Sequence, residues 1–154
     1  LGAPTSPMHR DHGDFVLAKT AADRINREAG REAIRFAPFD QNIIRWFDAA
    51  DIVLSATLIA EPFGCSIVEA MSRGRLVIAP RAGGIVDIAA KSPALYLYET
   101  GSALGLAHAL GKAMSLSEGE RKRLGELNRR SAENFSVEKI VPQLEAFYDE
   151  VVRR

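Results

Sequence analysis

The hydrophobic positions in the first third of the chain predict a helix, a strand and a second helix. Residues 15–29 carry apolar side chains at helical spacing and end before Gly30. Residues 33–39 alternate apolar and polar positions and include a proline near their end, which predicts a short strand. Asp40 is a candidate N-cap for a helix over residues 41–50.

From residue 51 the pattern alternates between short apolar runs and helical spacing. The runs predict buried strands at residues 51–56, 76–79 and 94–98, and the intervening segments predict helices at 66–73 and 85–90. Beyond Gly101 the pattern is helical throughout, over residues 103–114, 117–134 and 137–153. Strands that alternate with helices at this spacing predict an α/β fold with a parallel sheet and right-handed crossovers.

The composition indicates one domain without a strong electrostatic field. The 154 residues are 47% hydrophobic, which is ample for a single core but not for a second full domain. Lys and Arg total 20, as do Asp and Glu, so no net positive charge would attract nucleic acid or an anionic membrane. We therefore expect partners to be recognised locally, and no nucleic acid among them.

Cysteine usage and hydropathy favour a cytoplasmic protein. Cys65 is the single cysteine, which excludes an intramolecular disulfide and a multi-cysteine zinc site. No apolar run reaches the roughly 18–20 residues of a membrane span, and no secretory signal opens the chain.

The chain opens without Met, and residues 1–4 are typical of the end of a strand. We expect a fragment that lacks its first βα elements.

Two glutamates, Glu61 and Glu69, lie eight positions apart around a Pro-Phe-Gly turn before a predicted helix. The simplest interpretation is structural. Ser66 and Glu69 match the S-x-x-E capping box, in which each side chain accepts a hydrogen bond from a backbone N–H group. In that case Glu61 would be a solvated acid of the loop.

The position of this loop also favours a binding site. It follows the predicted strand at residues 51–56, and ligands of open α/β sheets bind beyond the carboxyl ends of the strands. A helix N-terminus favours phosphate, and Gly64 lets a backbone approach a ligand closely. Carboxylates accept hydrogen bonds from hydroxyl groups, so glutamates on both sides of a phosphate site suit a nucleotide-diphosphate sugar.

The segment "EPFGCSIVEAMSRGRLVIAPRAGGIVDI" resembles the E-x7-E region of retaining glycosyltransferases of the GT-B fold, family 4, also called glycosyl transferases group 1. The blocks "IRFAPF", "WFDAADIVLSA" and "NFSVEKI" agree with that family in order and spacing. The resemblance implies a Rossmann-like parallel sheet flanked by helices, with a helical C-terminal segment. Such a domain is the C-terminal, donor-binding half of a GT-B enzyme, so residues 1–154 would form one donor-binding domain.

The resemblance also implies roles for individual residues. Glu61 would face hydroxyl groups of the donor sugar, as the candidate catalytic residue, and Glu69 would hold the ribose hydroxyls. Backbone N–H groups would line the donor, those of Phe63 and Gly64 at the sugar and those of Cys65, Ser66 and Ile67 at the diphosphate. Further candidates are Gly83 and Gly84 in a turn, Arg81 as a phosphate ligand, and Phe36 and Pro38 at the base.

The implied reaction transfers a sugar from a nucleotide diphosphate to an acceptor with retained anomeric configuration. It needs no cofactor or metal, because amides, a helix dipole and basic side chains neutralise the leaving diphosphate. The family's Arg/Lys pair and its acceptor-binding domain would precede Leu1. For the chain alone we therefore expect weak donor binding and no transfer.

Several alternatives remain open at this stage. The chain is either half of an enzyme or a non-catalytic nucleotide-sugar binding or assembly module of the same fold. Sugar, lipid-linked and polysaccharide acceptors all fit, as does peripheral association of the full-length protein with the cytoplasmic face of a membrane. A metal site at His9, Asp11, His12 and Asp14 is a weaker alternative. The last helix, with Phe147 and Tyr148, resembles the helix that in GT-B enzymes reaches the N-terminal domain, and its apolar side predicts a dimer of the fragment.

Overall fold

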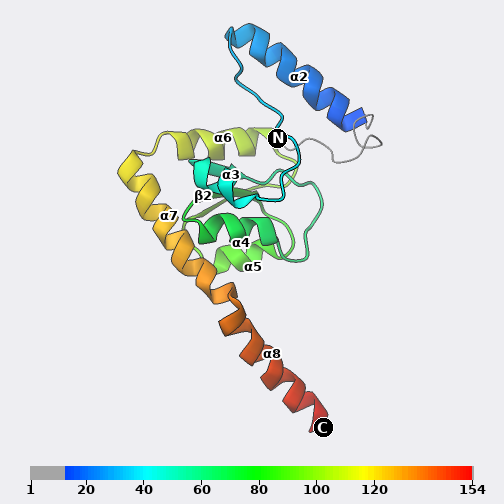
Figure 1. The fold of residues 1–154 in the computed structure, drawn as a ribbon, viewed down its shortest axis with the longest axis vertical. Helices are drawn as coiled ribbons and strands as arrows, with labels where there is room; N and C mark the ends of the chain where they lie inside the picture. The colour runs from blue at the N-terminus through cyan, green and yellow to red at the C-terminus, as the bar shows by residue number, and fades with distance from the viewer. Residues whose placement is uncertain (1–12, 154) are drawn as a thin grey trace. The chain divides into compact units, whose positions relative to one another are not determined.

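Figure 1 shows a computed structural model of the chain, which describes residues 13–153. The chain divides into two compact units, Leu1–Ile43 and Ile44–Arg154. The single donor-binding domain that the sequence predicts therefore stays a prediction.

The first unit contains helix α2 (Gly13–Ala29) and an extended segment. The prediction of a strand at residues 33–39 is wrong. Within the described residues, this segment forms no strand and contains one isolated β-bridge residue, Ala37. The Asn26 side chain occupies both backbone groups of Ile34: the Ile34 N–H donates to Asn26 Oδ1 at 2.7 Å, and Asn26 Nδ2 donates to Ile34 O at 2.9 Å. Pro38 has no N–H to donate. A side chain thus satisfies hydrogen-bonding groups that a neighbouring strand would otherwise take.

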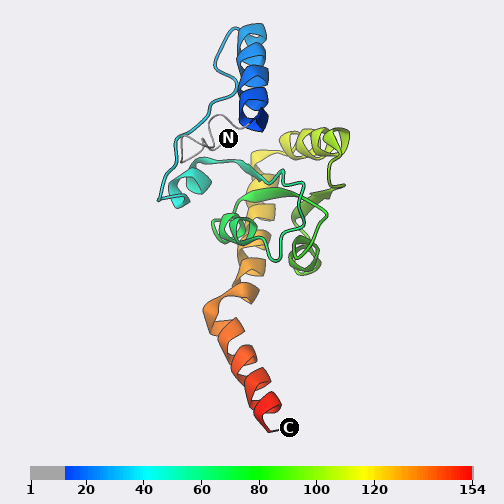
Figure 2. The same ribbon diagram turned by 90° about the vertical axis from the view of Figure 1, so that its right-hand side faces the viewer.

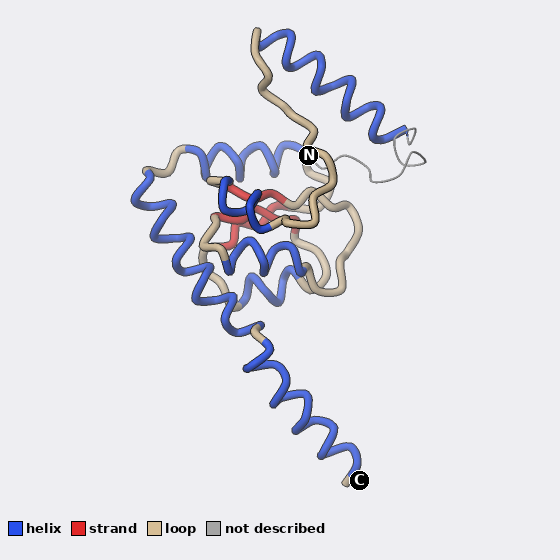
Figure 3. Tube along the Cα trace, viewed as in Figure 1, coloured by secondary structure: helices blue, strands red, loops and turns tan. Residues whose placement is uncertain are grey.

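The second unit is built on three parallel strands, β1 (Ile52–Leu54), β2 (Leu76–Pro80) and β3 (Leu95–Tyr98), in the order β1-β2-β3. Figure 3 shows these strands in red among the helices. Ile52 pairs with Leu76, and Val77 pairs with Leu95. The predicted α/β fold with a parallel sheet is confirmed.

Helices cover both faces of this sheet. Helices α4 (Cys65–Ser72) and α5 (Ile85–Ala90) lie on one face and α6 (Ala103–Met114) on the other (Figure 2). All residues of β2 are buried; Val77 and Ala79 join the cluster with α4 and α5, whereas Leu76 and Ile78 join the one with α6. Successive side chains of a strand point to opposite faces, so the continuous apolar run of β2 fills two cores.

The remaining α-helices were all predicted from the sequence, but some of them begin or end at other residues than predicted. Helix α3 is Ile44–Ala49, shorter than predicted, because Asp40 forms a turn by accepting a hydrogen bond from the Asn42 N–H at 3.0 Å. Helix α7 (Glu118–Ala132) ends in a 3-10 turn, η1 (Glu133–Phe135), and α8 spans Val137–Val152. Phe47 lies in the core as expected for a packing residue.

The capping box predicted at Ser66 and Glu69 does not form. Helix α4 begins one residue earlier than predicted, and its N-cap is Gly64, which has no side chain to accept a hydrogen bond. Ser66 is therefore the second helical residue and has the wrong position for a cap. A capping box is present instead at α7, between Ser117 and Glu120.

Helix α8 continues from η1 and leads away from the sheet of its unit (Figures 1 and 3). Each of its side chains is exposed, including the large apolar residues Ile140, Leu144, Phe147 and Tyr148. The apolar patch predicted from the sequence is therefore present. No helix in residues 13–153 is long and apolar enough to cross a membrane.

Candidate functional site

The site forms where β1 and β2 end. Because the two strands are parallel and adjacent, their following loops, residues 55–64 and 81–84, emerge at the same edge of the sheet. The Gly84 N–H donates to the Glu61 carbonyl oxygen at 3.0 Å. The structure thus brings together two segments that the sequence singled out separately, the Glu61 loop and the Gly83-Gly84 turn.

Only glycine allows this contact. A Cβ atom on Gly84 would overlap the Pro62 carbonyl oxygen and lie 2.9 Å from Phe63 Cα. A Cβ atom on Gly83 would overlap the Glu61 carbonyl oxygen and lie 3.1 Å from Glu61 N, and Gly83 has a φ of 53°, a conformation that favours glycine. Because both residues are glycine, the backbone of the turn packs directly against the backbone of the Glu61 loop and fixes the position of that loop.

Helix α4 presents free amides next to this loop. Gly64 has a φ of 102°, and its carbonyl oxygen accepts from the N–H groups of Ile67 at 3.0 Å and Val68 at 3.3 Å. Within the described residues, the N–H groups of Cys65 and Ser66 have no hydrogen-bond partner. The Ile67 N–H already donates within the first helical turn, and its predicted role at the diphosphate stays a prediction. Two amides remain for an anion at the N-terminus of α4.

Both glutamate carboxylates are available as acceptors. Glu61 is half-buried and Glu69 is exposed on α4, and neither carboxylate has a hydrogen bond or ion pair within residues 13–153. Arg129, which lies near Glu69, is occupied by Glu126 at 2.8 Å and Glu133 at 3.3 Å. No cation of the protein therefore neutralises Glu69 within the described residues. It can accept hydrogen bonds from hydroxyl groups of a ligand.

Glu69 also lines a pocket of about 300 Å³ between α4 and the end of α7. One wall is apolar and includes the Phe135 ring, and the remainder carries polar side chains. The lining residues are Val68, Glu69, Ser72, Arg129, Ala132, Glu133, Phe135 and Ser136.

Arg81 lies at the same edge of the sheet, but its guanidinium group has a partner. Arg81 Nε is 3.2 Å from Glu99 Oε1, and both side chains are more than half exposed. Its backbone is fixed to β3, since Arg81 N donates to Tyr98 O at 2.8 Å. An exposed ion pair of this kind is weak. Arg81 as a phosphate ligand stays a prediction.

Other candidates lie elsewhere. Phe36 and Pro38 belong to the first unit, where the Phe36 ring contacts Phe15 edge to face with centroids 5.4 Å apart. Their assignment to the nucleotide base stays a prediction. Of the metal alternative, His9, Asp11 and His12 lie outside the described residues. Among residues 13–153 no group of three or more metal-binding side chains gathers.

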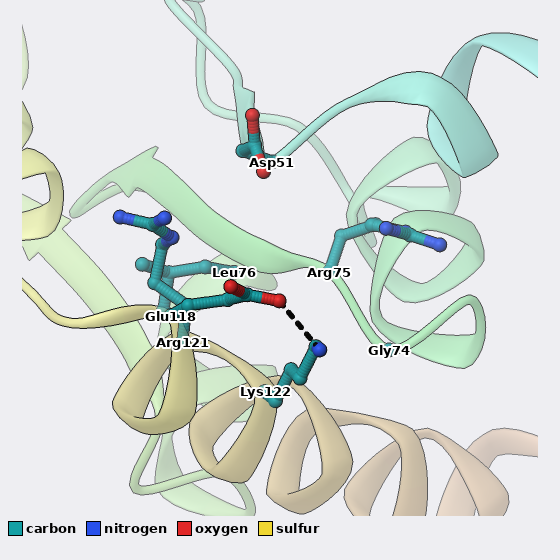
Figure 4. Close-up of a pocket in the computed structure, with 7 residues that line it drawn as sticks. All are labelled: Asp51, Gly74, Arg75, Leu76, Glu118, Arg121 and Lys122. Atoms are coloured by element: carbon teal, nitrogen blue, oxygen red, sulfur yellow. Dashed lines mark ion pairs between the residues drawn. The ribbon is translucent and has the colours of Figure 1, made fainter.

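A second pocket, of about 320 Å³, lies at the opposite edge of the sheet (Figure 4). It is lined by Asp51, Gly74, Arg75, Leu76, Glu118, Arg121 and Lys122. Its cations bind the protein itself: Lys122 Nζ is 2.6 Å from Glu118 Oε1, Arg121 donates to Leu116 O and Arg75 donates to Ala50 O. We therefore place the functional site at the carboxyl edge.

Tyr98 is a residue of this edge that the sequence analysis counted only as part of a strand. Its side chain is buried, and its hydroxyl donates to the Ser55 carbonyl oxygen at 3.1 Å, which ties β3 to the start of the Glu61 loop. Burial raises the pKa of the Tyr98 hydroxyl above its usual value. A strand pattern shows which residues are inside, but it does not show which carbonyl a buried hydroxyl reaches.

We expect Tyr98→Phe to destabilise the chain by about 0.5–1.5 kcal/mol, because Ser55 O loses its donor while the ring still fills the core. Urea unfolding monitored by circular dichroism measures this change. Tyr148→Phe on exposed α8 is the matched control and should have no effect. Equal unfolding midpoints for Tyr98→Phe and the wild type would show that this hydrogen bond adds nothing to stability.

The fold is shared with solved structures that include a glycosyltransferase and a protein in complex with UDP and glucose. A glycosyltransferase from Rickettsia africae ESF-5 is 26% identical, with a TM-score of 0.77 over 93% of this chain and 38% of that one. Anabaena Alr3699/HepE in complex with UDP and glucose is 25% identical, with a TM-score of 0.71 over 89% of this chain and 37% of that one. The fold is therefore that of the GT-B glycosyltransferases.

The sequence comparisons give the family. The family described as "Glycosyl transferases group 1" matches residues 12–115. The N-acetyl-alpha-D-glucosaminyl L-malate synthase of Bacillus anthracis is 32% identical over 125 residues, which are 79% of this chain and 32% of that protein. This chain belongs to the group 1 glycosyltransferase family, and it spans about a third of the length of that relative.

Proposed function

We propose that the chain is the donor-binding domain of a retaining glycosyltransferase of family 4, and that it binds a nucleotide-diphosphate sugar. The observation that carries this proposal is the joint position of unpaired amides and unpaired carboxylates at the carboxyl edge of the sheet. Cys65 and Ser66 offer N–H groups to a diphosphate, and Glu61 and Glu69 offer acceptors to hydroxyl groups. The similar Anabaena protein in complex with UDP and glucose supports the same ligand class.

In this proposal each group acts on a different part of the donor. Glu61 receives hydroxyl hydrogen bonds from the sugar, close to the N–H groups of Phe63 and Gly64, and Glu69 receives those of the ribose. The amides of Cys65 and Ser66 stabilise the negative charge that develops on the leaving diphosphate, and the dipole of α4 adds to their effect. The transfer is metal-independent and of the hexosyl type in this proposal.

The remaining parts of the proposal concern the whole protein. The acceptor, which is a sugar, a lipid-linked sugar or a polysaccharide, would bind to a further domain that also supplies basic residues to the diphosphate. We place the protein in the cytoplasm, with peripheral membrane association as an extension of this proposal. The chain by itself is expected to bind donor weakly and to transfer no sugar.

Calorimetric titration with UDP, GDP and ADP and their sugar conjugates tests the proposal. We expect one nucleotide to bind, and Glu69→Ala to weaken that binding by about 1–3 kcal/mol, because ribose hydroxyls lose their charged acceptor. Glu145→Ala, on exposed α8, is the matched control and should bind like the wild type. Equal affinities of wild type and Glu69→Ala would contradict the assignment of Glu69 to the donor.

A further inference from the structure

The Glu61 loop (residues 55–64), hereafter the donor loop, contacts Phe135, which lies far away in sequence, through its Pro-Phe-Gly turn. The rings of Phe63 and Phe135 lie edge to face, with centroids 5.5 Å apart and an interplanar angle of 66°. Phe135 is the last residue of η1, more than 70 positions after Phe63. Edge-to-face aromatic pairs add about 0.5–1.5 kcal/mol beyond the area they bury.

Phe135 has further contacts of its own, and its neighbour Asn134 fixes the segment that carries it. Its ring is half-buried and packs against the core cluster that contains residues of α4 and α5. Lys91 Nζ, just after α5, lies 5.0 Å from the centroid of the same ring. The neighbouring Asn134 donates through Nδ2 to Ser131 O and accepts from Lys139 Nζ, which ties η1 to both adjoining helices. The Phe135 ring is therefore a fixed surface against which Phe63 rests.

Phe63 lies directly before Gly64, the N-cap of the helix that carries the free amides. Gly64 has a φ of 102°, a conformation that glycine adopts without strain, so the flexible glycine backbone alone does not fix the direction of the chain at this point. The Gly64 carbonyl accepts from Ile67 and Val68, and the next two residues carry the unpaired N–H groups. A displacement of Phe63 would therefore act on the loop directly beside these amides.

We infer that Phe135 is a positioning residue for the donor loop, which it holds through Phe63 in the conformation that presents the amides of Cys65 and Ser66. The inference rests on the proposed function and gives a positioning role to a residue that also lines the pocket beside Glu69. In this inference, η1 and the end of α7 support the donor loop. The Gly83-Gly84 turn holds the other side of the loop, through the hydrogen bond from Gly84 to Glu61.

Hydrogen exchange of backbone amides, measured by NMR, tests the inference without a ligand. In Phe135→Leu the amides of Ile67, Val68 and Gly84, which report on the loop, should exchange up to about tenfold faster, whereas the β2 amide of Ile78 should keep its rate. Phe147→Leu, on exposed α8, is the matched control and should leave all four rates unchanged. A uniform acceleration, or none, would overturn the positioning role.

UDP titration of the same variants gives a second measurement. Phe135→Leu should weaken UDP binding up to about tenfold, Phe135→Tyr should restore it, and adding Phe63→Leu to Phe135→Leu should cause little further loss. Wild-type affinity in Phe135→Leu would overturn the inference. If the wild type binds GDP or ADP instead of UDP, that nucleotide replaces UDP in the titration. If it binds none of the three, the proposed function fails, and the exchange rates alone decide whether Phe135 orders the loop.

Discussion

Replacing Gly84 with alanine is expected to weaken UDP binding by at least about tenfold and to destabilise the second unit by about 1–3 kcal/mol. The new Cβ would lie 2.9 Å from Phe63 Cα and 3.0 Å from the Pro62 carbonyl carbon. Both neighbours are backbone atoms, so no side chain can move aside to relieve the overlap. The loop must shift away from the turn, which also breaks the hydrogen bond from the Gly84 N–H to Glu61 O.

The backbone of Gly84 makes this test specific for steric contact. Its φ and ψ of −62° and −12° are ordinary for alanine, so no conformational strain adds to the overlap. Gly111→Ala is the matched control: nothing lies within 4 Å of a Cβ at that position of α6, and the change should be neutral or slightly stabilising. Calorimetric titration with UDP and urea unfolding measure the two effects. If Gly84→Ala and Gly111→Ala behave alike, the close packing of turn and loop is not needed.

Asn128→Ala is expected to destabilise the second unit by about 2–4 kcal/mol. Asn128 lies on α7 and is completely buried. Its Nδ2 donates to the Arg75 carbonyl oxygen at 2.9 Å, and its Oδ1 accepts from the buried Ser92 hydroxyl at 2.7 Å. Alanine would leave a carbonyl and a hydroxyl unpaired in the interior and a small cavity beside them. Arg75 and Ser92, which precede β2 and β3, would no longer be hydrogen-bonded to α7 through Asn128.

Urea unfolding at 25 °C measures this loss, and Asn134→Ala provides the matched control. Asn134 is half-buried in η1, donates to Ser131 O at the end of α7 at 3.1 Å and accepts from the exposed Lys139 Nζ at 3.3 Å. We expect a loss of only about 0.5–1.5 kcal/mol there. A smaller loss for Asn128→Ala than for Asn134→Ala would mean that the buried polar contacts add little to stability.

The sequence contains a local signal for the burial of Asn128. Leu124, Asn128 and Ala132 are spaced by four residues and therefore share one face of a helix. The first and last of these are apolar, which places the asparagine among buried residues. A short polar side chain on a buried helical face requires hydrogen-bond partners, but helical spacing cannot identify them.

The sequence by itself determined the order of the strands and helices from residue 51 onward. Hydrophobic periodicity is a local property of the sequence. The continuous apolar run of β2 reflects burial on two faces, and α6 has the bounds that its helical spacing predicts. The paired glutamates and the Gly83-Gly84 turn were also apparent as separate motifs. Local pattern failed at residues 33–39, where Asn26 occupies the backbone groups of Ile34, and at the cap of α4, which depends on the conformation of Gly64.

Only the tertiary structure decided how these motifs meet. The contact of Gly84 with the Glu61 loop, the hydrogen bond from Tyr98 to Ser55 and the packing of Phe135 on Phe63 each join segments that lie more than 20 residues apart. Propensity and periodicity contain no information about such distances, because each describes a residue relative to its neighbours in sequence. The donor loop therefore acquires these contacts only in the folded second unit, where segments distant in sequence lie side by side.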